Sequence, residues 1–118
     1  MAEIAICDDS SFTRKMIINI LKTEGHSFVD TDDGDSLLNI LREKQFDCIF
    51  LDLLMPNKSG FDILKELKNR GNKCPIVIIS ADTQETTKQM CLSLGASAYL
   101  NKPPQKEELI QTLKKILS

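Results

Sequence analysis

Five short apolar runs alternate along the chain with segments whose apolar residues recur at the spacing of one helix face. The clearest runs are residues 48–53 and 75–79, which are rich in the large and β-branched side chains of strands buried on both faces. Strands that are separated by helices connect by crossovers, so they pair in parallel with helices on both sides of the sheet. The alternation therefore predicts the α/β class and a doubly wound (βα)5 fold.

The predicted elements follow the same alternation from end to end. We expect strands at residues 4–7, 27–29, 48–52, 75–79 and 98–100. The expected helices carry apolar stripes at Phe12, Met16, Ile17, Ile20 and Leu21; at Leu37, Leu38 and Leu41; at Phe61, Ile63, Leu64 and Leu67; at Met90, Cys91 and Leu94; and at Leu109, Ile110, Leu113, Ile116 and Leu117. Helix starts are expected at Ser10 or Ser11 and at the pattern Asp82-x-x-Glu85. Five strands in a chain of this size favour the flavodoxin-like order 2-1-3-4-5 over the other common doubly wound order.

Composition limits what the chain can be. Its 118 residues fit one domain, residues 1–118, and its net charge of −2 argues against nucleic acid as the main ligand. No apolar run approaches the length of a membrane span and no leader segment opens the chain, so we expect no membrane contact and a cytoplasmic location. Four cysteines without Cys-x-x-Cys spacing and a single histidine make a zinc site improbable.

Polar residues stand where four of the buried strands end. Asp8 and Asp9 follow the first strand, Asp52 ends the third, Ser80 ends the fourth and Lys102 follows the fifth. Because ligands of open α/β sheets bind at the carboxyl ends of the strands, these residues should meet at one rim. Three crowded carboxylates repel one another, so the site needs a cation or must take up a proton, and the oxygen ligands suit Mg²⁺ (or Mn²⁺). The lysine and the hydroxyl add donors for anionic oxygens, so the group fits transfer of a phosphoryl group to an aspartate.

Each of these residues also has an ordinary structural explanation. Asp8 and Asp9 suit the start of a helix, where carboxylates are favoured. Asp52 is compatible with a turn before Pro56, and Ser80 with the entry of a helix. A lysine such as Lys102 is usually a solvated charge. The prediction of a site therefore depends on the whole set, not on one member.

The set of motifs, taken in order, resembles the receiver domains of two-component response regulators, in particular stand-alone CheY-like receivers. The resemblance extends over essentially the whole chain, and it is carried by Asp8-Asp9-Ser10, Asp52-x-x-Met55-Pro56-x-x-x-Gly60, Ser80-Ala81 and Lys102-Pro103. Each motif alone is weak, but together they are highly specific.

The resemblance implies a role for each matching residue of the phosphorylation site. Asp52 would accept a phosphoryl group from a sensor histidine kinase. Asp9 and Asp52 would bind Mg²⁺ (or Mn²⁺) through their side chains, Leu54 through its backbone carbonyl, and Asp8 mostly through water. Lys102 and Ser80 would bind the phosphoryl oxygens, Lys102–Pro103 would be a cis peptide, and Tyr99 would be the aromatic switch residue.

The resemblance also implies how such a chain would signal. It would be a switch that catalyses its own phosphotransfer and autodephosphorylation, not a classical enzyme. Its downstream protein target would bind the face made by the fourth helix, fifth strand and fifth helix. The stretch Ser10-Ser11-Phe12-x-Arg14-Lys15 favours chemotaxis, and no output domain is expected in 118 residues. A receiver of a phosphorelay or a larger protein, and a non-phosphorylated scaffold of the same fold, remain alternatives.

Two other functions of α/β domains fit the residues less well. A flavin carrier would place a phosphate against the loop after the first strand, where Asp8 and Asp9 would repel it. A phosphohydrolase that attacks with aspartate usually has a second acid two residues further on, and Leu54 occupies that position.

Overall fold

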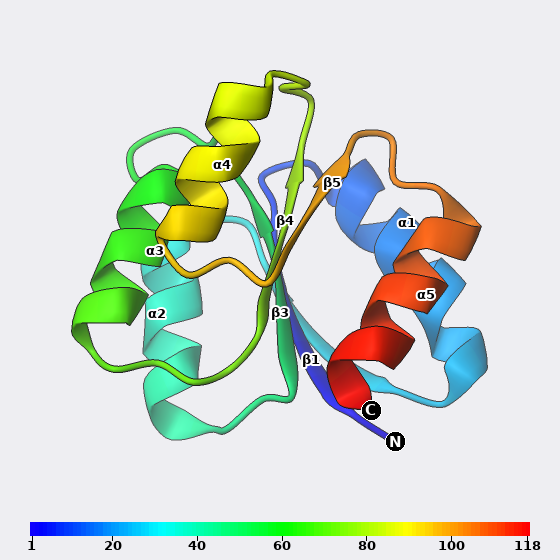
Figure 1. The fold of residues 1–118 in the computed structure, drawn as a ribbon. Coiled ribbons are helices and arrows are strands. Elements are labelled where there is room, and N and C mark those ends of the chain that lie inside the picture. The colour runs from blue at the N-terminus through cyan, green and yellow to red at the C-terminus, as the bar shows by residue number, and fades with distance from the viewer.

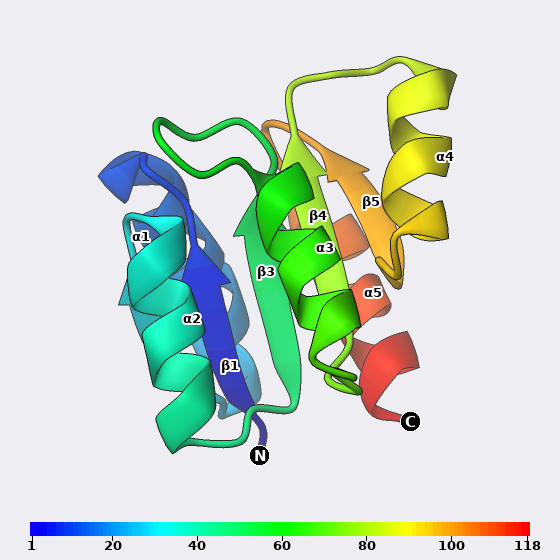
Figure 2. The same ribbon diagram turned by 90° about the vertical axis from the view of Figure 1, so that its left-hand side faces the viewer.

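Five parallel strands form one sheet in the order β2–β1–β3–β4–β5, as predicted (Figures 1 and 2). This computed structural model describes all residues, Met1–Ser118. The strands are β1 Glu3–Cys7, β2 Ser27–Thr31, β3 Cys48–Asp52, β4 Ile76–Ser80 and β5 Ala98–Asn101. The helices are α1 Ser11–Leu21, α2 Gly34–Glu43, α3 Gly60–Asn69, α4 Glu85–Ser93 and α5 Lys106–Leu117, with a 3-10 helix η1 at Lys22–Glu24.

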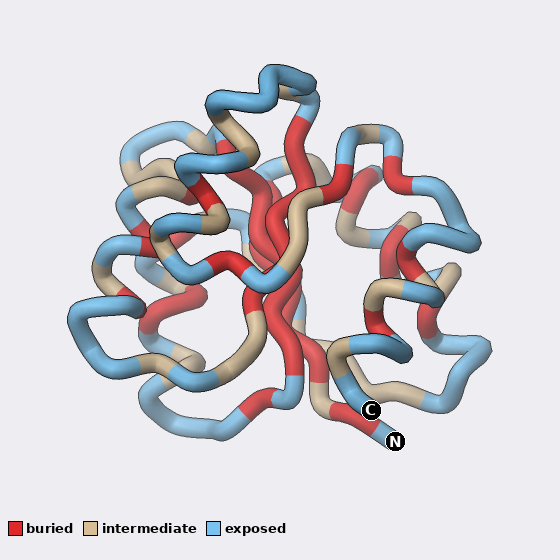
Figure 3. Tube along the Cα trace, viewed as in Figure 1, coloured by how far each residue is buried: buried red, intermediate tan, exposed pale blue.

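The sheet separates two layers of apolar packing. Helices α1 and α5 cover one face, and α2, α3 and α4 cover the other (Figure 1). Side chains of a strand point alternately to the two faces, so Phe50 of β3 joins the α1/α5 layer while Ile49 and Leu51 join the opposite layer. Every residue of β3 and β4 is buried, which explains why these two strands are the most apolar runs of the sequence (Figure 3).

Short polar side chains fix where three of the helices begin. Ser10, Asp33 and Ser59 precede α1, α2 and α3, and each accepts a hydrogen bond from the backbone three residues on. Ser59 and Asp62 form a reciprocal capping box, which satisfies two backbone donors at the start of α3. Because Ser59 lies in the loop after β3, this cap also fixes the chain close to Asp52.

The prediction for the apolar face of α1 was wrong at Phe12, which is 76% exposed. The buried positions are Thr13, Ile17 and Leu21, spaced four residues apart. This spacing gives the inner stripe of the helix, and Phe12 lies one residue off it, about 100° around the axis. The Thr13 hydroxyl can be buried there because it donates to Ser10 Oγ at 3.3 Å.

The helix-start pattern at Asp82 was also wrong. Helix α4 begins at Glu85, and the residue before it, Gln84, makes no side-chain cap. The Asp82 carboxylate instead accepts from the Gln84 N–H and from the Thr87 hydroxyl, both at 2.8 Å. Asp82 therefore organises the loop between β4 and α4 without being the cap itself.

Gly60 is required by a close approach of two backbone segments. Its N–H donates to Leu53 O at 2.7 Å, and an added Cβ would lie 2.6 Å from Asp52 O and 2.7 Å from Leu53 Cα. Any side chain at this position would displace the backbone that follows β3. The glycine of the motif thus sets the position of the loop behind Asp52.

The carboxyl ends of the strands lie together at the upper edge of the sheet in Figure 1. Buried polar side chains are rare in the molecule, and three of the four are Asp8, Asp52 and Ser80. The fold therefore brings three of its four buried polar side chains to one rim.

None of the helices combines the length and the apolar composition that crossing a membrane requires.

Candidate functional site

The two buried carboxylates come from adjacent central strands. Asp52 is the last residue of β3 and is 4% exposed, and Asp8 directly follows β1 and is 2% exposed. These two strands are paired along their length, so their carboxyl ends lie side by side. Asp9 is exposed at the same rim, and the carboxylate oxygens of all three lie within 4.8 Å of one another. The predicted acidic cluster is thus assembled by the fold.

Lys102 bridges the two buried carboxylates. Its Nζ lies 3.0 Å from Asp8 Oδ2 and 3.2 Å from Asp52 Oδ1, and its side chain is 23% exposed. The Lys102 N–H donates to Ser80 O at 2.8 Å, so the backbone that carries the ammonium group is fixed to the end of β4. The next peptide, Lys102–Pro103, is cis, as the resemblance implied.

The pKa of Asp52 is raised from its ordinary value of 3.8 to about 6. Burial is the main cause and repulsion from Asp8 the second, while the Lys102 ammonium opposes both. The pKa of Lys102 is raised as well: its burial acts to lower the value, but the contacts with Asp8 and Asp52 outweigh this. Three carboxylates against one ammonium leave excess negative charge that favours a further cation.

The donor set fits Mg²⁺. Oxygen atoms on one octahedral Mg²⁺ lie at about 2.1 Å from the ion, hence roughly 3 to 4.2 Å from one another. One carboxylate oxygen each of Asp8, Asp9 and Asp52 lies within 4.8 Å of the other two, so small movements would bring all three onto one ion, and the cluster holds no nitrogen or sulfur ligand. The residues that could hold the ion are therefore these three, together with carbonyls of the loop after β3.

Leu54 lies in that loop, with its side chain 62% exposed. The loop is held by the Gly60–Leu53 hydrogen bond, by a left-handed turn at Asn57 (φ 71°) and by Lys58. Lys58 pairs with Asp35 at 3.1 Å and with Glu66 at 3.5 Å, which ties the loop to α2 and α3. The sequence patterns do not reveal these ion pairs, because spacing along the chain does not show which helices the loop approaches.

Ser80 and Tyr99 are linked through the backbone of Asp82. Ser80 is buried, and its Oγ accepts from the Asp82 N–H at 3.1 Å. Tyr99 is half-buried on β5, and its hydroxyl donates to Asp82 O at 2.6 Å. Burial raises the pKa of the Tyr99 phenol, and the nearby Ser80 hydroxyl partly opposes this rise. One residue of the β4–α4 loop thus connects the rim to the predicted switch residue.

The thiols do not add a second reactive group. All four cysteines are free, and burial raises the pKa of Cys7 to about 11 and of Cys48 to about 12. A raised thiol pKa lowers the fraction of reactive thiolate. The imidazole of His26 accepts a hydrogen bond from the Ala2 N–H, away from the acidic rim.

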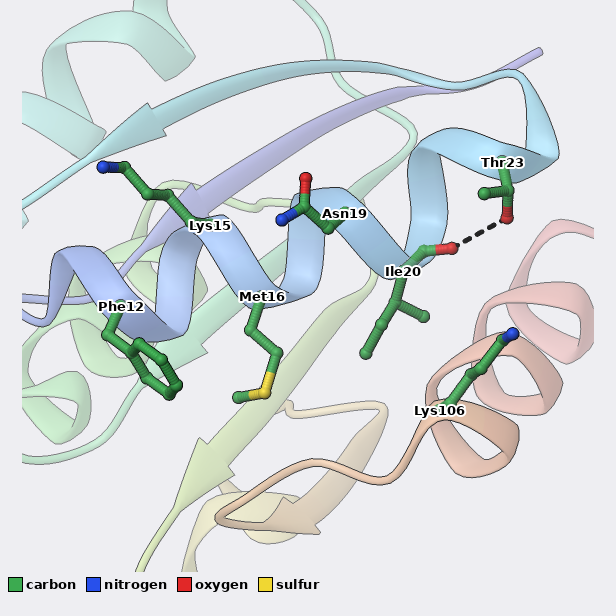
Figure 4. Close-up of a pocket in the computed structure, with 7 residues that line it drawn as sticks. All are labelled: Phe12, Lys15, Met16, Asn19, Ile20, Thr23 and Lys106. Atoms are coloured by element: carbon green, nitrogen blue, oxygen red, sulfur yellow. Dashed lines mark hydrogen bonds between the residues drawn. The ribbon is translucent and has the colours of Figure 1, made fainter.

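An open groove of about 530 Å³ lies on α1 and contains none of the predicted site residues (Figure 4). It is lined by Phe12, Lys15, Met16, Asn19, Ile20, Thr23 and Lys106. These side chains offer apolar surface and ammonium groups but no acid, base or nucleophile pair. The chemistry of the molecule is therefore at the acidic rim, not in this groove.

Comparison with known proteins shows which family the chain resembles in sequence and in fold. The family described as response regulator receiver domain matches residues 4–114. The structure of the Francisella response regulator 1452 receiver domain superposes with a TM-score of 0.94 and 26% identity, covering 99% of this chain and 97% of that one. Vibrio cholerae chemotaxis protein CheY4 superposes with a TM-score of 0.91 and 30% identity over 99% of both chains.

Similar full-length sequences include transcription factors. The transcriptional regulatory protein CpxR of Escherichia coli is 32% identical over 99% of this chain and 50% of its own length. The chain spans about half the length of the curated relatives it matches.

The raised pKa of Asp52 predicts how stability changes with pH. A carboxylate whose folded pKa exceeds its unfolded value of 3.8 holds a proton more tightly when folded, so the native protein loses stability as pH rises from about 4 to 6. Asp52→Asn should remove this loss. At pH 7.5 without metal it should raise the free energy of unfolding by about 2 kcal/mol, given roughly 1.4 kcal/mol per pKa unit less the lost Lys102 contact.

Urea unfolding of both proteins in EDTA checks this at pH 7.5 and pH 4.5. The advantage of Asp52→Asn should shrink at the lower pH, where native Asp52 is protonated. An advantage that does not change with pH would contradict the assigned charge state.

Proposed function

Because the chain belongs to the receiver domain family of two-component response regulators, we propose that it is a phosphoacceptor switch that is phosphorylated on Asp52 with Mg²⁺ (or Mn²⁺). A histidine kinase is the phosphodonor of such domains. The strongest support is the contact of Lys102 with both Asp52 and Asp8 inside a cluster of three carboxylates. This arrangement combines a nucleophile, a place for a divalent cation and a donor for phosphoryl oxygens.

In the proposed reaction, an Asp52 oxygen attacks the phosphorus of the donor. A phosphorus–oxygen bond forms at Asp52, and the bond to the leaving group breaks with its electron pair. Lys102, already 3.2 Å from Asp52, moves its ammonium contact to a phosphoryl oxygen, and Ser80 donates its hydroxyl to another. Asp8, Asp9, Asp52 and the Leu54 carbonyl would hold the metal ion, which neutralises charge on the phosphoryl oxygens when bound.

The route from the site to the surface would pass through Asp82. If Ser80 turns its hydroxyl toward a phosphoryl oxygen, the Asp82 N–H loses its acceptor. The Asp82 carbonyl is bonded to Tyr99, so a shift of this peptide changes the support of the Tyr99 ring on β5. A local charge event would thereby be passed to the β4–α4 loop and to a half-buried aromatic side chain.

The downstream target would be a protein that binds the face formed by α4, β5 and α5. Tyr99 lies on this face, and Met90 of α4 is 52% exposed. Helix α4 buries only Cys91 of its nine residues, so little packing resists its displacement. The net charge of −2 supports a protein target over nucleic acid for this domain.

Two outputs have support from the comparisons. The likeness to CheY4 over 99% of both chains supports chemotaxis, which we propose as the first output. The likeness to CpxR supports control of transcription by a longer protein as the second candidate.

Cells that carry the native protein or Asp52→Asn separate these outputs by swimming tracks and transcript profiles. Altered reversal frequency with unchanged transcripts supports chemotaxis. Unchanged swimming with altered transcripts supports the second output.

Labelling with acetyl phosphate tests the phosphoacceptor directly. The native protein should gain one phosphoryl group by intact-mass measurement when Mg²⁺ is present and none in EDTA. Asp52→Asn should gain none under either condition, because its amide cannot attack phosphorus. The matched control is Asp47→Asn, which changes an exposed aspartate just before β3, at the opposite end of the strand.

The control should be labelled like the native protein. Labelling that persists in Asp52→Asn would defeat the assignment of the acceptor. A native protein that stays unlabelled with Mg²⁺ would support the scaffold alternative.

A further inference from the structure

The backbone of Asp8 is bonded to the edge strand β2 directly through its N–H and indirectly, by way of Arg14 of α1, through its carbonyl. Its N–H donates to Thr31 O at 3.1 Å. Its carbonyl accepts from Arg14 Nη1 at 2.8 Å, and Arg14 Nε donates to Asp30 Oδ2, also at 2.8 Å. Thr31 and Asp30 both belong to β2, which contributes no residue to the acidic cluster. The guanidinium group of Arg14 thus joins the start of the β1–α1 loop to β2.

The carbonyl that Arg14 binds belongs to the peptide between Asp8 and Asp9. Fixing this peptide plane fixes the direction in which the backbone of Asp9 leaves it. The Asp9 carboxylate has no hydrogen bond or ion pair in the structure, although Asp8 Oδ1 accepts from the Ser10 N–H at 2.8 Å and Oδ2 pairs with Lys102. The position of the Asp9 side chain therefore depends on its backbone, and hence on the Arg14 contact.

We propose that Arg14 is a positioning residue of the metal site, which bridges the Asp8–Asp9 peptide to Asp30 and so holds Asp9 ready for the divalent cation. This inference rests on the proposed function, because it takes Mg²⁺ as the ion bound by the cluster. Arg14 touches neither the ion nor Asp52. Its side chain is 18% exposed and the Asp30 side chain 41% exposed, so the bridge lies at the edge of the site.

The geometry of the bridge requires a guanidinium group. Two of its nitrogens point to two different acceptors at the same time, which its planar fork allows. A lysine ammonium keeps the positive charge but is a single point on a flexible stem. Arg14→Lys therefore separates the geometry of the bridge from its charge.

The charge of Arg14 and its positioning role predict opposite changes in Mg²⁺ affinity when Arg14 is replaced. A cation beside an acidic cluster repels an incoming Mg²⁺, so loss of the Arg14 charge would strengthen metal binding if the field were its main contribution. Loss of positioning weakens metal binding instead. Residues that orient metal ligands typically account for about 10- to 100-fold in affinity, which is larger than the screened effect of one charge.

Calorimetric titration of the unphosphorylated protein with MgCl₂ tests the proposal on four proteins: native, Arg14→Met, Arg14→Lys and Lys15→Met. We expect the dissociation constant to rise about tenfold in Arg14→Met and severalfold in Arg14→Lys. Lys15→Met is the matched control, since it removes one positive charge from the neighbouring position of α1, whose side chain makes no ion pair. It should bind Mg²⁺ as tightly as the native protein or slightly more tightly.

The outcomes separate this inference from the proposed function. Two results would overturn the positioning role and leave the metal site intact, provided that the native protein binds Mg²⁺. One is an unchanged dissociation constant in Arg14→Lys, and the other is an unchanged or lower dissociation constant in Arg14→Met. Native protein that binds no Mg²⁺ would overturn both this inference and the proposed function. If urea unfolding shows that Arg14→Met is not folded, the dissociation constant of Arg14→Lys, which keeps the positive charge, decides whether Arg14 positions the metal site.

Discussion

The contact of Lys102 with Asp8 and Asp52 is the interaction on which the charge balance of the site depends. Two carboxylates that are almost fully buried would repel each other and lack hydration if no cation were near. The ammonium group at 3.0 and 3.2 Å compensates part of this charge, and the exposed Asp9 adds more negative charge beside it. The resting site is therefore held together but remains short of positive charge.

The charged groups of this balance lie at the ends of β1, β3 and β5, and neighbouring elements fix them in place. Asp8 follows β1, and its backbone is held by Thr31 of β2 and by Arg14 of α1, which pairs with Asp30 of β2. Strand β3 delivers Asp52, and the absence of a side chain at Gly60 lets the next loop pack directly behind it. The ladder between β4 and β5 joins Ser80 O to the Lys102 N–H. The site is thus a property of the whole parallel sheet.

The sequence was sufficient for the sheet and for the members of the acidic cluster. Strands β3 and β4 are buried on both faces, so their residues had to be apolar and were easy to recognise. The polar residues after them were informative because parallel strands end at one edge. The position of Phe12 was not predictable in this way, because an amphipathic stripe with one extra apolar residue fits two neighbouring faces of a helix.

Contacts between distant segments were beyond the sequence patterns. Asp82 could have been a helix cap, but its carboxylate bonds Gln84 and Thr87 and its carbonyl accepts from Tyr99, seventeen residues further on. The Arg14–Asp30 pair joins a helix to a strand that no local motif connects. Such pairings depend on how elements approach in three dimensions, and no spacing rule specifies them.

The most direct test of the central claim is an NMR titration of the Asp52 carboxyl carbon, with and without Mg²⁺. The crowding of buried carboxylates predicts a pKa of about 6 without metal. It also predicts a lower pKa in saturating Mg²⁺, because a bound cation favours the charged carboxylate. A pKa close to the ordinary value of 3.8 without metal, unchanged when Mg²⁺ is added, would contradict the account.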